Sequence, residues 1–288
     1  MKKILNILSW LALLGGATAL VGFTKKQQAK QPLTDIKIFI DKPATSRFVT
    51  NDDIKNLFKN QGYSTEEQSI AEINISELES LLSNNSSIEK AQVYVSISGK
   101  LTIEVKERTP IVRLYNKQSE SFYLDQFGSL MPLSNKYAAR VLLVNGNIDI
   151  PYSTVHQLEH LEGKLNKLFQ KENTSAVENT ALINRLKIDE EDITGAHQLK
   201  ALFEIAKFIS TDKFWNSQIS QLFVNDNAEI EMIPRVGNHT IVLGSANNIE
   251  EKFDKLMIFY KKGLNNTGWN NYSTINLKYK NQVVCTKR

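Results

Sequence analysis

The chain has 288 residues, which is room for about two domains of ordinary size. Its formal net charge of +4, from 35 basic and 31 acidic residues, is too small to indicate a nucleic-acid-binding protein. A hydrophobic content of 41% excludes wholesale disorder, and a mean hydropathy of −0.30 excludes a polytopic membrane protein. The single cysteine, Cys285, excludes an intrachain disulfide and a cysteine-based zinc site.

The first segment differs from the rest, because residues 4–23 read ILNILSWLALLGGATALVGF and carry no charge. As a helix this segment would span roughly 30 Å, the thickness of a hydrocarbon core. The Ala17-Thr18-Ala19 sequence also fits the cleavage site of a signal peptide, but the apolar run continues past it to Phe23. We therefore expect an uncleaved transmembrane signal-anchor at 4–23. Residues 1–3 are then a cytoplasmic tail, and residues 24–32 form a polar linker outside the cytoplasm.

The region 33–107 predicts a small α+β unit. Residues 36–40 are typical of a strand, and Thr50 followed by Asp53 is a capping pattern that opens a helix. A second helix, capped by Asn74 or Ser76, carries a leucine stripe and precedes two alternating strand segments, 91–97 and 101–105. The order strand, helix, helix, strand, strand predicts a three-stranded sheet with two helices on one face.

The region 108–288 predicts one mostly antiparallel β domain with helices. We expect helices at 151–171, 196–209 and 249–260, with a surface loop at 172–195. Strand patterns occur at 111–114, 122–125, 141–144, 219–224, 229–233 and 240–243. A final strand at 274–279 is expected to be extended by residues 282–284.

Patterns typical of catalysis are scarce in this sequence. It contains no glycine-rich phosphate loop and no nucleophile elbow, and Cys285 near the basic chain end is interpreted as an ordinary strand thiol. His156, Glu159 and His160 match H-x-x-E-H, which places two imidazoles one helical turn apart beside a possible general base. A third ligand is not evident, and the surrounding leucines explain the helix without a metal. We therefore expect that the protein is not an enzyme and binds no cofactor or metal. The alternative is an exported zinc hydrolase that uses the H-x-x-E-H residues.

Three phrases follow one another in the exported part. They are VKERTPIVR at 105–113, YLDxxGxxMPL at 123–133 and INLKYKNQVV at 275–284. In this order, after an anchor and a strand–helix–helix–strand–strand unit, they resemble the FtsQ/DivIB family of bacterial cell-division proteins. The resemblance covers essentially the whole chain. It implies an α+β fold with a transmembrane helix, a POTRA domain at 33–107 (β-α-α-β-β) and a β domain at 108–288, without a catalytic site.

The resemblance also implies a function. Such a protein is a bitopic scaffold of the divisome in the inner membrane, mostly periplasmic and located at the septum, that links early and late division proteins. Its POTRA domain contacts other division proteins, and the C-terminal edge of its β domain receives an FtsB-like protein of an FtsB/FtsL-like coiled coil by strand addition. The residues implied at that edge are Ile275, Leu277, Tyr279, Lys280, Asn281, Gln282, Val283 and Val284.

The chain departs from the family at two places. Asn281-Gln282-Val283-Val284 stands where members often have small residues, and Ser245 stands where a basic residue follows the turn at Gly244. A POTRA-bearing outer-membrane assembly or secretion component is a further alternative. We see one such unit and no series of barrel strands, which disfavours it.

Overall fold

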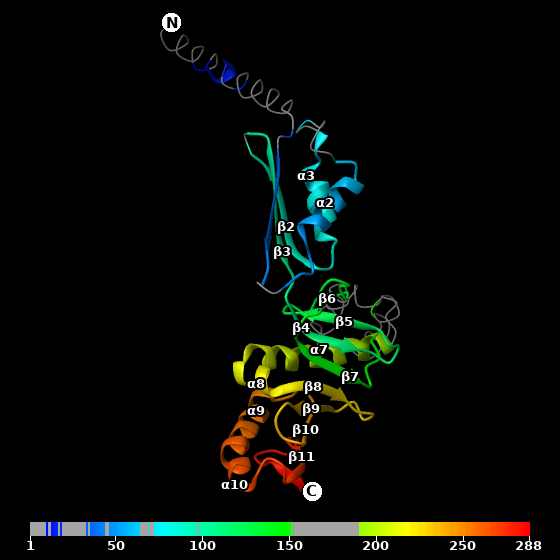
Figure 1. Ribbon diagram of the computed structural model, residues 1–288, viewed down its shortest axis with the longest axis vertical. Coiled ribbons are helices and arrows are strands. Elements are labelled where there is room, and N and C mark those ends of the chain that lie inside the picture. The colour runs from blue at the N-terminus through cyan, green and yellow to red at the C-terminus, as the bar shows by residue number, and fades with distance from the viewer. Residues whose placement is uncertain are drawn as a thin grey trace. The chain divides into compact units, whose positions relative to one another are not determined.

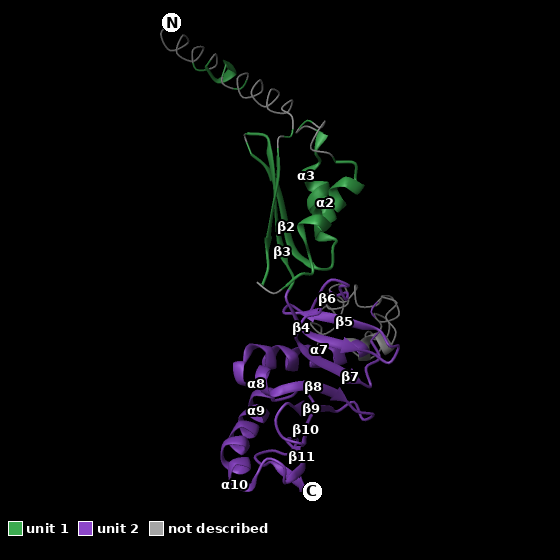
Figure 2. Cartoon of the chain, viewed as in Figure 1, with its two compact units in different colours: residues 1–108 green, residues 109–288 purple. Residues whose placement is uncertain are grey.

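The computed structural model describes residues 10, 13–16, 18, 33, 35–43, 46–63, 69, 72–96, 98–150, 152 and 190–288. The chain divides into two compact units, Met1–Arg108 and Thr109–Arg288 (Figure 2). Among the described residues, no helix is both long and apolar enough to cross a membrane. Most of the anchor predicted at 4–23, and nearly all of the helix predicted at 151–171 with its H-x-x-E-H pattern, lie outside the described residues.

The first unit has the predicted order of elements. They are β1 (Asp35–Asp41), α2 (Asn51–Asn60), α3 (Ile75–Ser83), β2 (Ile88–Val95) and β3 (Lys100–Glu107). The strands form a sheet in the order β1-β3-β2, with β1 parallel and β2 antiparallel to the central β3. Both helices lie on one face of this sheet (Figure 1). The residues between the two layers include Ile54, Phe58, Leu78, Leu82, Leu101, Ile103 and Val105, and all are buried.

Local signals in the sequence fix where these helices begin. The Thr50 hydroxyl accepts a hydrogen bond from the Asp53 amide at 3.3 Å, and the Asp53 carboxylate accepts one from the Thr50 amide at 3.0 Å. This is the capping box that the sequence predicts. For α3 the cap is Asn74, whose side chain accepts from the Glu77 amide at 3.2 Å.

The end of the first unit is fastened by a buried carboxylate. Glu107, the last residue of β3, is only 1% exposed. It accepts hydrogen bonds from the Ser46 hydroxyl and, at 2.8 Å, from the Val49 amide. The loop that leads into α2 is therefore tied to the end of the central strand.

The second unit contains a nine-stranded sheet. In chain order its strands are β4 (Pro110–Tyr115), β5 (Ser121–Asp125), β6 (Leu130–Met131), β7 (Leu142–Gly146), β8 (Ile219–Val224), β9 (Ile230–Pro234), β10 (Thr240–Gly244), β11 (Tyr272–Asn276) and β12 (Val284–Lys287). The spatial order is β12-β11-β10-β9-β8-β7-β4-β5-β6. Of the eight pairings between described strands, five are antiparallel and three are parallel.

Helices connect and cover this sheet. They are α7 (Glu190–Thr211), α8 (Lys213–Gln218), α9 (Ile249–Ile258), the π-helical segment η2 (Phe259–Leu264) and α10 (Asn265–Thr267). One core cluster joins helix residues such as Leu202 and Phe253 to the strand row Val144, Leu222 and Ile241. The last helices provide the crossover that a parallel pair such as β10 and β11 requires.

Several predictions for the second unit need correction. The predicted end of the loop at 172–195 is wrong, because α7 already begins at Glu190. The helix predicted at 249–260 ends at Ile258 and continues as η2. The final strand predicted at 274–279 ends at Asn276, and residues 282–284 do not extend it. The chain instead reverses at Asn281, whose φ of 58° is in the left-handed region that asparagine tolerates, and returns as β12 antiparallel to β11.

Candidate functional site

The outermost strand of the nine-stranded sheet is β12, which has β11 as its neighbour in the sheet. The Arg288 amide donates to the Asn271 carbonyl at 3.1 Å, on the β11 side. Because backbone groups of an antiparallel strand alternate in direction, the N–H and C=O groups of Cys285 and Lys287 face the open edge. Among the described residues these groups have no strand partner, so this edge offers donors and acceptors to one further strand.

The two faces of β12 differ in their surroundings. Val284 is 41% exposed and is paired with Asn276 on the sheet face opposite the buried core. Cys285 is paired with the fully buried Ile275 and packs, half-buried, against the core cluster on the helix side. Burial raises the pKa of the Cys285 thiol, which favours the protonated and less nucleophilic form.

A lysine on α9 holds the turn between β11 and β12. The Lys255 ammonium donates to the Tyr279 carbonyl at 2.8 Å and to the Leu277 carbonyl at 3.4 Å. Tyr279 is 47% exposed, and Lys280, Asn281 and Gln282 are also exposed in this turn. The turn therefore presents polar and aromatic side chains beside the open edge.

The eight residues that the resemblance implied at this edge fall into two groups, buried core residues and residues of the turn and of β12. Ile275 and Leu277 are fully buried core residues and are not available as a contact surface. Tyr279, Lys280, Asn281, Gln282 and Val283 belong to the turn and its exit, and Val284 opens β12. The eight residues do not include the rest of this strand, residues 285–287, although Cys285 itself was interpreted as a strand thiol. The signal that could have revealed it is the polar Lys280-Asn281 pair between two strand-like segments.

Lysines also surround the turn at Gly244, after which the resemblance led us to expect a basic residue in place of Ser245. The Lys252 ammonium donates to the Ser245 carbonyl at 2.8 Å. The side chain of Lys278 lies so close to Gly244 that a Cβ there would be 2.9 Å from its Cδ, and its ammonium contacts the Glu229 carboxylate at 2.6 Å. This hydrogen bond raises the pKa of Lys278. Two positive charges thus lie close to this turn although Ser245 itself is neutral.

The phrase YLDxxG has a structural role. Asp125 is fully buried, and its Oδ1 accepts from the amides of Phe127 at 2.9 Å and Ser129 at 2.8 Å. Gly128 completes the turn with a φ of +85°. These bonds form the tight turn between β5 and β6, and they leave Asp125 no role at an exposed surface.

The candidate zinc ligands His156, Glu159 and His160 lie outside the described residues. Within the part of the chain that the structure describes, no group of three or more His, Cys, Asp or Glu residues could hold a metal ion.

Comparison with known families agrees with this architecture. A family model described as FtsQ/DivIB, C-terminal related, matches residues 109–286, and a POTRA-like domain model matches residues 32–106. The fold is thus a POTRA-like domain followed by a β-rich domain. The first match covers more than half of the chain, and the chain belongs to the FtsQ/DivIB family of non-enzymatic cell-division proteins. No curated protein matches the chain.

Proposed function

We propose that this protein is a single-pass scaffold of the divisome, held in the inner membrane by residues 4–23 and exposed to the periplasm from residue 24 onward. It joins early and late division proteins at the septum. The family of its β-rich domain and the uncharged segment of 20 residues near its N-terminus support this proposal. Its POTRA-like domain contacts other division proteins, as the family resemblance implies.

The central contact in this proposal is the capture of an FtsB-like protein from an FtsB/FtsL-like coiled coil. A strand of the partner adds to β12 and pairs with the outward N–H and C=O groups of Cys285 and Lys287. The observation that carries this proposal is the open edge of β12. Main-chain hydrogen bonds supply affinity in such an arrangement, and side chains on alternate positions supply specificity.

A proline at Lys287 tests this contact. Lys287→Pro removes one N–H from the open edge, and edge strands tolerate proline where the N–H faces solvent. We expect the full-length protein to lose at least about tenfold in affinity for the partner coiled coil, because hydrogen bonding and strand docking are both disturbed. Binding is measured by titration of the purified FtsB-like and FtsL-like proteins of the same bacterium.

Lys287→Gln is the matched control, since it removes the charge and keeps the N–H. The proposal requires Lys287→Gln to bind much better than Lys287→Pro. Equal binding of both variants and the unchanged protein would mean that the partner does not pair with β12.

A further inference from the structure

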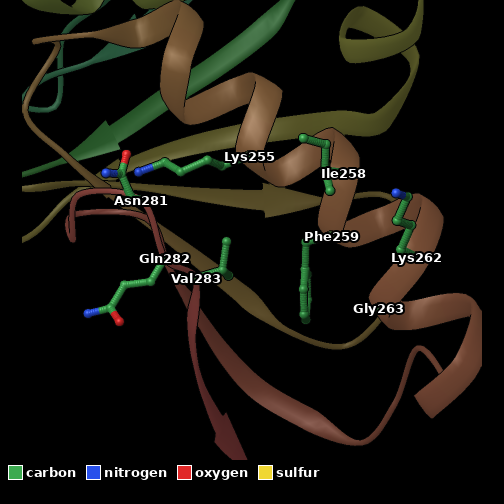
Figure 3. A pocket seen from close by; sticks show the side chains of 8 residues that line it. All are labelled: Lys255, Ile258, Phe259, Lys262, Gly263, Asn281, Gln282 and Val283. Atoms are coloured by element: carbon green, nitrogen blue, oxygen red, sulfur yellow. The ribbon is translucent and has the colours of Figure 1, made fainter.

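A groove lies beside the open edge, on the helix side of the sheet (Figure 3). Its walls come from α9 and η2 on one side and from the exit of the β11–β12 turn on the other. The groove has a volume of about 330 Å³ and is lined by residues that include Ile258, Phe259, Lys262 and Val283. This volume is at the low end of the roughly 300–1,000 Å³ of typical ligand pockets, and it is enough for a large side chain.

The apolar part of the groove is partly open to solvent in the described structure, although the Phe259 ring also contacts the Tyr272 ring, with 5.8 Å between the ring centroids. Ile258 is 57% exposed, and in Figure 3 Phe259 and Val283 face the same space from opposite walls. The Phe259 ring lies directly over Gly263, because a Cβ at Gly263 would be only 2.7 Å from the ring. The glycine thus leaves room for the ring beside the helix.

The rim of the groove is basic. Lys261 and Lys262 are exposed on η2, and Lys262 has no ion pair within the described residues. Two acidic residues near this end of the sheet have lysine partners, since Glu229 contacts Lys278 at 2.6 Å and Glu251 lies 3.9 Å from Lys255. Asp254 on α9 is exposed and does not line the groove. The two charged residues that line the groove, Lys255 and Lys262, are both basic, which favours an acidic segment.

The groove and the edge are continuous along one face. Val283 and Cys285 are two residues apart, so their side chains share the helix-facing side of the chain as it enters β12. A strand added to β12 presents every second side chain to this side. We infer that the groove receives one large apolar side chain of the partner strand, and that a neighbouring carboxylate of the partner pairs with Lys262. This inference rests on the proposed function and specifies the chemistry of the partner segment.

A second copy of the chain is a poor occupant for electrostatic reasons. Its own edge carries Lys280, Lys287 and Arg288, so pairing two copies through β12 would bring basic edges together. An acidic partner strand with an apolar anchor complements both the charge and the shape of the site.

Two pairs of variants of the full-length protein test the inference. Ile258→Asp places a charge in the groove, and its control Phe127→Asp changes an exposed apolar residue in the turn before β6, at the opposite edge of the sheet. Lys262→Glu reverses the rim charge, and its control Lys117→Glu makes the same change at an exposed site between β4 and β5. The FtsB-like and FtsL-like proteins of the same bacterium serve as the probe.

We expect each groove variant to weaken binding about tenfold to a hundredfold, and each control to leave it unchanged within about twofold. Replacing the acidic residues of the partner strand by lysine, one at a time, should identify one change that restores binding to Lys262→Glu. Gly263→Ala, which pushes the Phe259 ring from its place, should also weaken binding without adding a charge.

The outcomes separate this inference from the proposed function. If Lys287→Pro weakens binding and the groove variants do not, strand addition stands and the groove assignment is overturned. If the unchanged protein does not bind the probe, both proposals fall. If the unchanged protein sediments as a dimer and Ile258→Asp as a monomer, the occupant is a second copy and the inference is wrong.

Discussion

His239 is a buried histidine that lies close to the C-terminal residue, Arg288. Its Nε2 lies 3.2 Å from the Tyr260 hydroxyl, and Arg288 hydrogen-bonds the carbonyl of the adjacent Asn238. Burial lowers the pKa of His239, and the charge of Arg288 lowers it further. Burial also raises the pKa of Tyr260 to about 12, so this hydroxyl stays protonated at neutral pH.

The depressed pKa of His239 predicts a pH-dependent stability. Below the ordinary histidine pKa of about 6.5 the unfolded chain binds a proton that the folded chain resists, so the free energy of unfolding falls as pH decreases. Above that pKa the contribution is fully present. His239→Gln keeps a polar side chain and removes this titration. Urea unfolding from pH 7.5 to 5.5 should show a steeper loss for the unchanged protein than for His239→Gln. Parallel curves would contradict the assignment.

Several residues in the first two sequence phrases that resemble the family, 105–113 and 123–133, have structural roles. Glu107 fastens the loop before α2, and Asp125 with Gly128 forms the turn between β5 and β6. These side chains are buried or bonded within their own unit. The phrases at 105–113 and 123–133 thus contribute residues that build the domains, whereas the phrase at 275–284 reaches only the first residue of β12.

At the level of elements, the parallel pair β7 and β8 depends on one glycine. Gly146 lies opposite Val224 with a φ of +104°, and a Cβ there would be 2.2 Å from the Val224 carbonyl oxygen. That oxygen accepts from the Asn147 amide at 2.7 Å, so the backbone has little room to move.

Gly146→Ala should therefore destabilise the second unit by at least about 3 kcal/mol, from a backbone clash added to left-handed strain. Gly128→Ala is the control, because its φ is also positive while a Cβ there meets the Phe203 ring at 3.7 Å or more. We expect it to cost about 1–2 kcal/mol. Thermal unfolding of both variants measures the difference. Equal destabilisation would show that the close approach to Val224 is unimportant.

Elements with local signals were predictable from the sequence. The capping box at Thr50 and Asp53 locates α2, and the strand pattern at 219–224 matches β8 at both ends. The return at Asn281 was missed, because Val283 and Val284 continue a strand-like pattern whose direction depends on one left-handed residue. The three parallel pairings could not be predicted from the sequence either. They join strands that are not consecutive hairpin partners, and they depend on how the whole core packs.

A protein anchored in the membrane as proposed must retain its N-terminal segment. The apolar run extends past Ala19 to Phe23, which favours an anchor over a cleaved signal peptide. The intact mass of the protein extracted from membranes should therefore correspond to a chain that retains residues 4–23. A protein that begins at Leu20 and is recovered without detergent would contradict the anchor.

The two ends of the nine-stranded sheet differ as binding edges. β6 has two residues, and the fully buried Met131 is one of them. β12 has four residues, three of which are exposed, and it lies beside the basic groove. A short, buried edge is poorly suited to strand addition, so we expect the partner to bind at β12.

Hydrogen exchange of the full-length protein with and without the partner coiled coil tests this assignment most directly. We expect the amides of Cys285 and Lys287 to become protected on binding, because they pair with the added strand, while exchange in β6 stays unchanged. Protection elsewhere in the chain, with these two amides exchanging as fast as before, would contradict it.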